Sequence, residues 1–192
     1  MEPSSHAIIT SRLELGLSRV EMADEVLDFY TRNAVHLSPW EPPPLQGFWT
    51  AAYHRERLSK AEGEAAAGAA LRWWLRLRDN PQTLVGTVGL SAIARGPFQS
   101  VFLGYALDGS LQSQGLMHEA LDAVAKHAFS EALNLHRIQA NVRPENQRSL
   151  RLLERLGFER EGFARDYLYI NGAWRDHYLY ALRNENFIGV PN

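Results

Sequence analysis

The sequence predicts a single mixed α/β domain with helices on both faces of its sheet. Within residues 100–121, apolar side chains first alternate with a period of two and then, beyond a turn at Asp108, recur with a period of 3.6, which indicates a strand followed by a helix. The chain closes with two alternating stretches around Asn171-Gly172, a strong hairpin signal. Three consecutive strands are also indicated, at 73–78, 83–94 and 100–107. The predicted order is β-α-α-β-β-β-α-β-α-β-β, in one domain over residues 1–192.

The first part of the chain is predicted to hold one strand and two helices. Ser18 followed by Glu21 has the capping-box spacing that starts a helix. Four prolines between positions 39 and 44 exclude a helix there and hold the chain extended around Trp40 and Glu41. This loop is either a rigid connector or a fixed wall of a substrate pocket. The strand is expected at 7–17, and the helices at 18–36 and 48–70.

The second part is predicted to contain a parallel crossover. An apolar stripe predicts a helix from Gln114 to Phe129, and the next strand, 136–142, should lie parallel to the strand before that helix. Asn146 is a good N-cap for a helix that ends at Gly157. Gly104, in mid-strand, is consistent with a bulge that separates the two parallel strands, or simply makes room for a bulky neighbour. The closing hairpin is expected over 161–170 and 173–182.

Composition excludes several classes of function. The formal net charge of −2 lacks the basic excess of a nucleic-acid-binding protein. The chain has no cysteine, so disulfides, thiolate metal sites and a covalent cysteine intermediate are excluded, and its 7 histidines lack metal-ligand spacing. No apolar run is long enough for a membrane span, and the first residues lack the pattern of a signal peptide. A soluble cytoplasmic protein without metal is therefore expected.

One turn has the features of an anion site. Gly115 lies where a helix begins, so unpaired backbone N–H groups and the positive end of the helix dipole could hold a phosphate. An ordinary strand-to-helix turn explains a lone glycine equally well. A wider sequence pattern favours the anion site, since residues 112–117 fit the phosphate-binding motif Q/R-x-x-G-x-G/A except at Met117.

Other segments of the chain carry a family resemblance together with this motif. They are PWEP at 39–42, LGY at 103–105, QGLMHEAL at 114–121, HRI at 136–138, LGFEREG at 156–162 and NGAWRDH at 171–177.

These segments resemble the GNAT superfamily of N-acetyltransferases, in particular its ribosomal-protein-acetylating, RimJ/RimL-type branch. The resemblance covers nearly the whole chain, is nearest to the RimJ type, and implies acetyl-coenzyme A as co-substrate. Asn146 would contact the cofactor, and Ser149 would face the sulfur. Leu153 stands where many relatives place a general-acid Tyr, which shifts that role to Ser149 or to a water that Ser149 orients. The pyrophosphate would be held by the amides of Gln112, Ser113, Gln114, Gly115, Leu116 and Met117, and the pantetheine arm would lie beside Tyr105, Ala106 and Leu107.

Without cysteine, direct attack of an amine within a ternary complex is the simplest mechanism. An α-amine, with a reference pKa of about 7.7–8.0, needs little help in deprotonation. Glu41 is the favoured base, or a binding residue for the charged amine; Ser149 is the other predicted catalytic residue. Asp166, Asp176 and His177 are further candidates for the base. Predicted substrate contacts are Trp40, Glu41, Tyr167 and Asp176, although hairpin aromatics and charges more often serve strand pairing.

Three functions remain open on these grounds. The first is acetylation of the N-terminal α-amine, Ala or Ser, of a ribosomal or other protein. The second is acetylation of a small amine such as an antibiotic, polyamine or amino sugar. The third is a coenzyme A-binding regulatory module without turnover, for which Leu153 and Met117 are the hints. A homodimer is left open.

Overall fold

The computed structural model describes residues 7–189, and its elements follow the predicted order with one strand more. The strands form a single sheet with the order β1-β2-β3-β4-β5-β6-β8-β7, in which β5 and β6 are parallel and all other neighbours antiparallel. The strands are β1 Ile8–Ile9, β2 Leu13–Leu17, β3 Leu71–Leu77, β4 Asn80–Ala94, β5 Ser100–Leu107, β6 Arg137–Val142, β7 Glu159–Ile170 and β8 Ala173–Arg183. The helices are α1 Ala23–Leu37, α2 Ala51–Ala66, α3 Leu116–Phe129 and α4 Gln147–Arg155.

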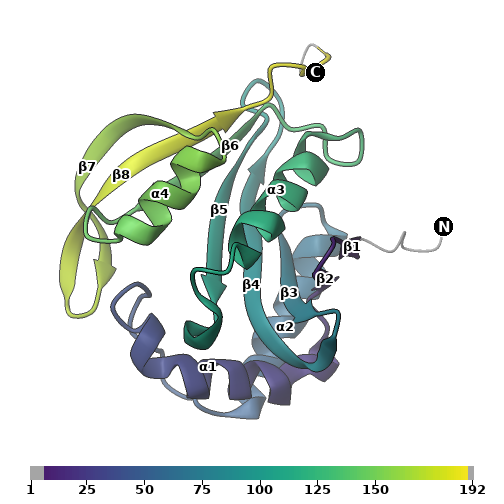
Figure 1. The fold of residues 1–192 in the computed structure, drawn as a ribbon, viewed down its shortest axis with the longest axis vertical. Helices are drawn as coiled ribbons and strands as arrows, with labels where there is room; N and C mark the ends of the chain where they lie inside the picture. Colours follow the sequence, from purple (N-terminus) through teal and green to yellow (C-terminus); the bar gives the residue numbers. More distant parts are fainter. Residues whose placement is uncertain (1–6, 190–192) are drawn as a thin grey trace.

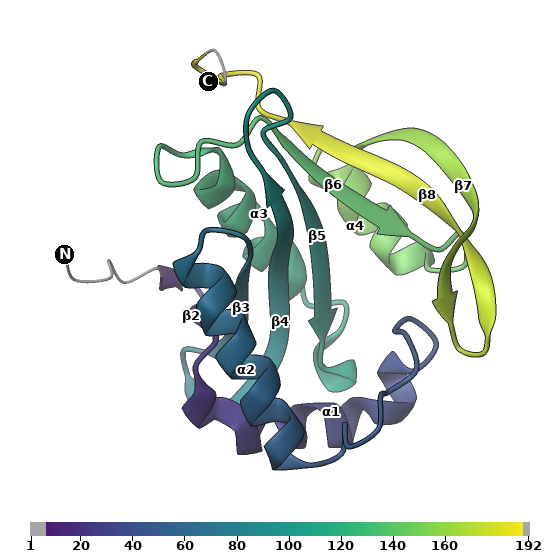
Figure 2. The same cartoon turned by 180° about the vertical axis from the view of Figure 1, so that it is seen from behind.

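Helices cover both faces of the sheet, as Figures 1 and 2 show. The face under α3 and α4 carries the larger core, in which Trp73, Leu121 and Leu153 are almost fully buried. The opposite face packs on α1 and α2 through a smaller core that includes Phe29 and Trp74. Because successive residues of a strand point to opposite faces, Trp73 and Trp74 belong to different cores.

The parallel pair β5–β6 is short. Its register covers Ser100 to Phe102 against Arg137 to Gln139, and from Leu103 onward β5 has no partner on its β6 side among the described residues. On its other side β5 continues to pair with β4 through Leu107. The two parallel strands therefore diverge at mid-length, as Figure 2 shows.

Two predictions for the first strand and its helix are wrong. The segment 7–17 is not one strand but two, because residues 10–12 turn aside to bind a carboxylate on α3. Ser18 does not cap a helix: its hydroxyl accepts a hydrogen bond from Trp74 Nε1 at 3.1 Å in the smaller core, and a 3₁₀ turn at Val20–Met22 precedes α1. A buried indole N–H needs an acceptor, and this need determines where Ser18 points.

Other boundaries are corrected as well. Helix α2 begins after Thr50, whose side chain accepts from the Tyr53 amide, and it is shorter than the predicted 48–70. Helix α3 begins at Leu116 rather than Gln114. Gly104 is not bulged, since it pairs in regular register with Gly89, and the irregularity between β4 and β5 lies at Ser91/Ala94. The divergence of β5 from β6 therefore arises where pairing stops, without an inserted residue.

Candidate functional site: a divided sheet with an anion-binding turn

The turn between β5 and α3 is anchored by a buried carboxylate. Asp108 accepts hydrogen bonds from Arg32 Nε at 3.0 Å, Asn33 Nδ2 at 3.1 Å and the Ser110 amide at 3.0 Å. Burial alone would raise the pKa of Asp108, but these hydrogen bonds lower it to about 2, so the group is ionised at neutral pH. Gln112 is also tied down, between His36 Nε2 and Arg148 Nη1. The turn is thereby fixed to α1 and α4.

The backbone of this turn presents unpaired N–H groups. Ser113 and Gly115 both have positive φ, 63° and 77°, so successive amides turn toward one side. The first hydrogen bond of α3 runs from the Glu119 amide to the Gly115 carbonyl at 3.1 Å, which leaves the preceding amides without helical partners. Leu116 and Met117 bury their side chains in the core, so their contribution to an anion site is the main chain alone. The departure at Met117 is thus compatible with anion binding.

A charged residue that the sequence did not reveal lies beside this turn. Arg12 donates from Nη1 to the Gln114 carbonyl at 2.9 Å and from Nε to Glu119 at 2.7 Å. Glu119 also accepts from Thr10 Oγ1 and from the Arg12 amide, and these bonds lower the pKa of Glu119 to about 2 against the effect of burial. The carboxylate that would otherwise repel an anion at the start of α3 is therefore neutralised by the N-terminal segment.

The divergence of β5 and β6 opens a cavity of about 530 Å³. Its wall is formed on one side by Leu103, Gly104 and Tyr105 of β5, whose main chain has no partner toward β6 in the described structure, and on the other by Asn141. An extended chain can pair with such a free edge. The predicted contacts Tyr105, Ala106 and Leu107 all lie on this edge.

Ser149 and Tyr105 meet at one end of the cavity. Asn146 caps α4 by accepting from the Ser149 amide at 3.2 Å, which fixes Ser149 in the first turn of the helix. Burial raises the pKa of Tyr105 to about 12, and the nearby Ser149 hydroxyl offsets part of that rise, although the two hydroxyls lack good hydrogen-bond geometry. Both are therefore neutral O–H donors at physiological pH. Leu153, by contrast, is fully buried in the core.

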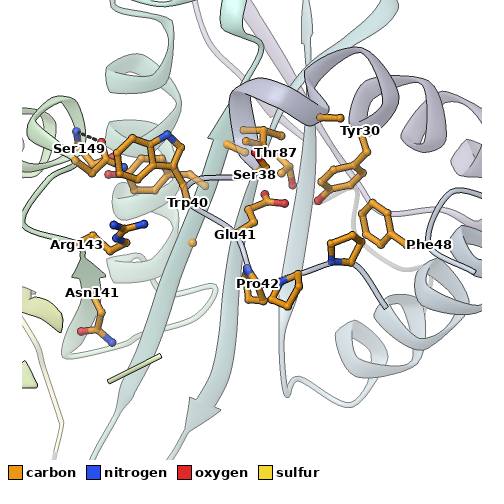
Figure 3. Close-up of a pocket in the computed structure, with 18 of the residues that line it drawn as sticks. Tyr30, Ser38, Trp40, Glu41, Pro42, Phe48, Thr87, Asn141, Arg143 and Ser149 are labelled. Atoms are coloured by element: carbon orange, nitrogen blue, oxygen red, sulfur yellow. Dashed lines mark hydrogen bonds between the residues drawn. The ribbon is translucent and has the colours of Figure 1, made fainter. Parts of the chain in front are cut away.

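Trp40 and Glu41 lie between Ser149 at one end of the cavity and Tyr30 at the other, as Figure 3 shows. Arg143 holds their loop by donating to the Pro39 carbonyl at 2.6 Å and lying 5.4 Å from the centre of the Trp40 ring. Burial raises the pKa of Glu41, while the positive charges of Arg57 and Arg72 counteract the rise. A carboxyl group with a raised pKa is a better proton acceptor than an exposed one.

Two predicted substrate contacts lie outside the cavity lining. The hydroxyl of Tyr167 accepts from Asn141 Nδ2 at 2.7 Å, and its ring packs on His177; both partners line the cavity. Asp176 accepts from the Asp166 amide at 2.9 Å, at a point where Asp166 has a positive φ of 48° and the β7–β8 register shifts. Tyr167 thus supports two lining residues without lining the cavity itself, and Asp176 stabilises an irregular part of the hairpin.

Comparison with known proteins accounts for this architecture. The model of the acetyltransferase (GNAT) domain matches residues 12–159. The chain belongs to the GNAT acetyltransferase family. It is 38% identical over 175 residues to the [ribosomal protein uS5]-alanine N-acetyltransferase of Escherichia coli K12, a match that covers 91% of this chain and 89% of the relative.

Solved structures agree. The ribosomal-protein-S5-alanine acetyltransferase of Vibrio fischeri superposes with a TM-score of 0.90 at 33% identity, covering 95% of this chain and 99% of that one. Mycobacterium smegmatis RimJ, solved with a coenzyme A disulfide, superposes with a TM-score of 0.84 at 31% identity, covering 93% and 85%. The predicted fold and family are confirmed, and this GNAT protein is an acetyl-CoA-dependent N-acetyltransferase.

The site fits that co-substrate. The turn at 112–117 offers free amides to a diphosphate, and the unpaired edge of β5 offers main-chain partners to the amide-bearing arm. No helix among residues 7–189 is both long and apolar enough to span a membrane. Nor does that part of the chain bring together three or more side chains suited to hold a metal ion.

Proposed function

We propose that this GNAT enzyme acetylates the N-terminal α-amine, Ala or Ser, of a ribosomal or other protein by direct attack in a ternary complex. The observation that carries the proposal is the continuity of the cavity, which joins Ser149 and the free edge of β5 to the loop with Trp40 and Glu41. The relative from E. coli, which acts on an alanine of a ribosomal protein by its name, supports the choice of acceptor.

Glu41 receives the amine. Its carboxylate attracts a protonated N-terminus, and its raised pKa suits it to accept the proton that must leave before attack. Trp40 and the three prolines that follow Glu41 keep this carboxylate in place at little entropic cost. Because an α-amine has a reference pKa of about 7.7–8.0, no strongly basic group is required.

Ser149 stabilises the departing thiolate. When bound, acetyl-CoA supplies the thioester whose acetyl group is transferred. The Ser149 hydroxyl lies at the end of the divergent strands, where that thioester would meet the amine, and the Tyr105 hydroxyl beside it is a second neutral donor. Asn146 orients Ser149 by capping the same turn.

A small-molecule amine is the second candidate, since a cavity of about 530 Å³ falls within the usual size of small-ligand pockets. A panel assay separates the candidates by measuring thiol release from acetyl-CoA with peptides that begin with Ala, Ser or Met, and with spermine and kanamycin. Turnover of the Ala and Ser peptides supports the proposal. Turnover of small amines alone overturns it, and so does coenzyme A binding without any turnover.

A further inference from the structure

At the floor of the cavity, two glycines lie side by side on neighbouring strands. Arg72 on β3 pairs with Gly89 on β4, which pairs with Gly104 on β5, so the three residues share the face that packs on α1 and α2. A Cβ atom on Gly104 would meet nothing within 4 Å, whereas one on Gly89 would lie 3.1 Å from Arg72 Nη2. The Arg72 guanidinium therefore lies over Gly89, at the end of an open path that begins at the gap between β5 and β6.

A second arginine reaches the same floor from α2. Arg57 donates from Nη2 to the Tyr30 hydroxyl at 3.1 Å, and its guanidinium carbon lies 5.1 Å from the centre of the Tyr30 ring. Its other terminal nitrogen, Nη1, is buried and has no hydrogen-bond partner within residues 7–189. A buried charged donor without a partner is costly and rare in folded proteins. At a cavity wall, this nitrogen is available to a group that enters the cavity.

The charges at this end of the cavity are not balanced. Glu41 is the sole carboxylate in the described lining, and no hydrogen bond between Glu41 and Arg57 or Arg72 is found there. The third lining arginine, Arg143, already pairs with Glu145 at 3.2 Å. A second carboxylate, Glu64 of α2, acts on Arg72 from outside the lining, and it is paired with Lys60 at 3.7 Å. Within the lining, two guanidinium groups thus face one carboxylate, and this excess of positive charge favours an anion.

We propose that Arg57 and Arg72 bind a carboxylate of the acceptor that lies within one residue of the reacting amine. Neighbouring strands are about 4.8 Å apart, so Arg72 stands about 10 Å from Gly104 in the sheet, and its guanidinium, lying over Gly89, shortens that span to about 5 Å. An amine at the β5 edge therefore places an acidic side chain of the second residue, or the α-carboxylate of a small amino acid, on the two guanidinium groups. This inference rests on the proposed transfer to an amine in the same cavity.

Binding in the presence of coenzyme A tests the inference independently of turnover. Isothermal titration calorimetry would compare two peptides that differ only at the second position, Ala-Glu and Ala-Gln. The wild-type enzyme should bind the Glu peptide at least about tenfold more tightly, as expected for a charged hydrogen bond, and Arg57→Gln and Arg72→Gln should each abolish that preference. Arg55→Gln, the same change at an exposed position of α2, should leave it intact.

Equal affinity of the wild-type enzyme for the two peptides would overturn the proposal for a protein acceptor, whatever the stability of the variants. Equal loss of affinity for both peptides in the arginine variants would do the same, because it would mean a merely structural role. Arg57→Lys and Arg72→Lys should restore part of the preference, since a charge without the planar fork remains.

The source of the carboxylate is decided by a second arm with free glutamate and β-alanine. Arginine-dependent binding of these amino acids, without any preference between the peptides, assigns the floor to a small acceptor and overturns the protein acceptor of the proposed function. Turnover of both peptides at equal kcat/KM has the opposite meaning. The proposed function would be supported, and the proposal that Arg57 and Arg72 bind a carboxylate would be overturned.

Discussion

The two surfaces proposed for the two substrates are built in different ways. The turn at 112–117 is a contiguous segment that uses main-chain amides and the start of α3. Its choice of residue is restricted chiefly at Gly115, whose backbone is left-handed. The cavity floor instead combines side chains from α1, α2, β3 and β4, namely Tyr30, Arg57, Arg72 and Thr87. A surface made from backbone should tolerate changes of side chain such as that at Met117, whereas a surface made from a few buried side chains should change its specificity with each of them.

The largest effect is expected where the two surfaces meet. Ser149→Ala should lower kcat about 100-fold, because it removes a donor to the departing sulfur, while the Kd of coenzyme A stays within about twofold. Steady-state kinetics and calorimetry give the two values, and Ser59→Ala, an exposed position of α2, is the matched control. If the variant retains wild-type turnover and Tyr105→Phe does not, the donor is Tyr105.

Glu41→Gln should change the acceptor side alone. We expect kcat/KM for the peptide to fall about tenfold, as a rise in KM if Glu41 binds the amine or as a fall in kcat if it accepts the proton. Because burial raises the pKa of Glu41, the wild-type enzyme should lose activity on acidification at a higher pH than an ordinary carboxylate would cause. That acidic limb should be absent from the variant, and a wild-type profile in Glu41→Gln would exclude both roles. Glu56→Gln, exposed on α2, serves as control.

Gly115→Ala tests the backbone surface. The substitution adds about 1 kcal/mol of left-handed strain at a φ of 77° and places a methyl group 3.5 Å from Arg12 Nη2. Coenzyme A affinity should fall about tenfold, since the amides can no longer hold their orientation. Gly96→Ala has the same strain at a φ of 65° in open space and should lower the Tm without weakening coenzyme A binding. An equal affinity in the two variants would contradict a diphosphate site at this turn.

Asp108→Asn should have the smallest effect, on stability. Loss of the charged hydrogen bonds from Arg32, Asn33 and Ser110 should cost about 1–2 kcal/mol at neutral pH. The folded pKa of about 2 lies below the unfolded value of about 3.9, so this contribution is present above pH 4 and is lost as the pH falls toward 2. Urea unfolding at several pH values gives the free energy of unfolding, which should depend less on acid pH in the variant than in the wild type. Asp122→Asn, on the exposed side of α3, should show neither the loss of stability nor the change in pH dependence.

Sequence patterns foresaw the parts of the molecule that depend on neighbours along the chain. The change of period near Asp108 placed β5 and α3, and Asn146 caps α4 as its position suggested. The family and the acetyl-CoA co-substrate followed from matching segments along nearly the whole chain, while the binding residues around Gly115 stay a prediction. These features are local because a cap, a turn or an amphipathic stripe is set within a few residues.

Features that depend on distant partners could not be foreseen. Arg143 reaches the Pro39 carbonyl across 104 positions, and Arg12 reaches Glu119 across 107, so neither contact has a signature in the local sequence. The failed cap at Ser18 has the same origin, because Trp74, 56 positions away, takes its hydroxyl. Arg57 and Arg72 lacked any pattern that would have distinguished them from surface arginines. Tyr167 and Asp176 of the hairpin were predicted to contact the substrate. In the structure, Tyr167 instead binds Asn141 of the cavity wall, and Asp176 binds the backbone where the hairpin is irregular.

The brief pairing of β5 with β6 has a thermodynamic consequence. A guest that had to replace a paired strand would first have to break the hydrogen bonds of that strand. Here the three residue pairs at Ser100–Phe102 hold the two strands together at one end, and beyond them no described residue pairs with β5 on its β6 side. An incoming pantetheine arm can therefore form its own hydrogen bonds while none within the protein has to be given up.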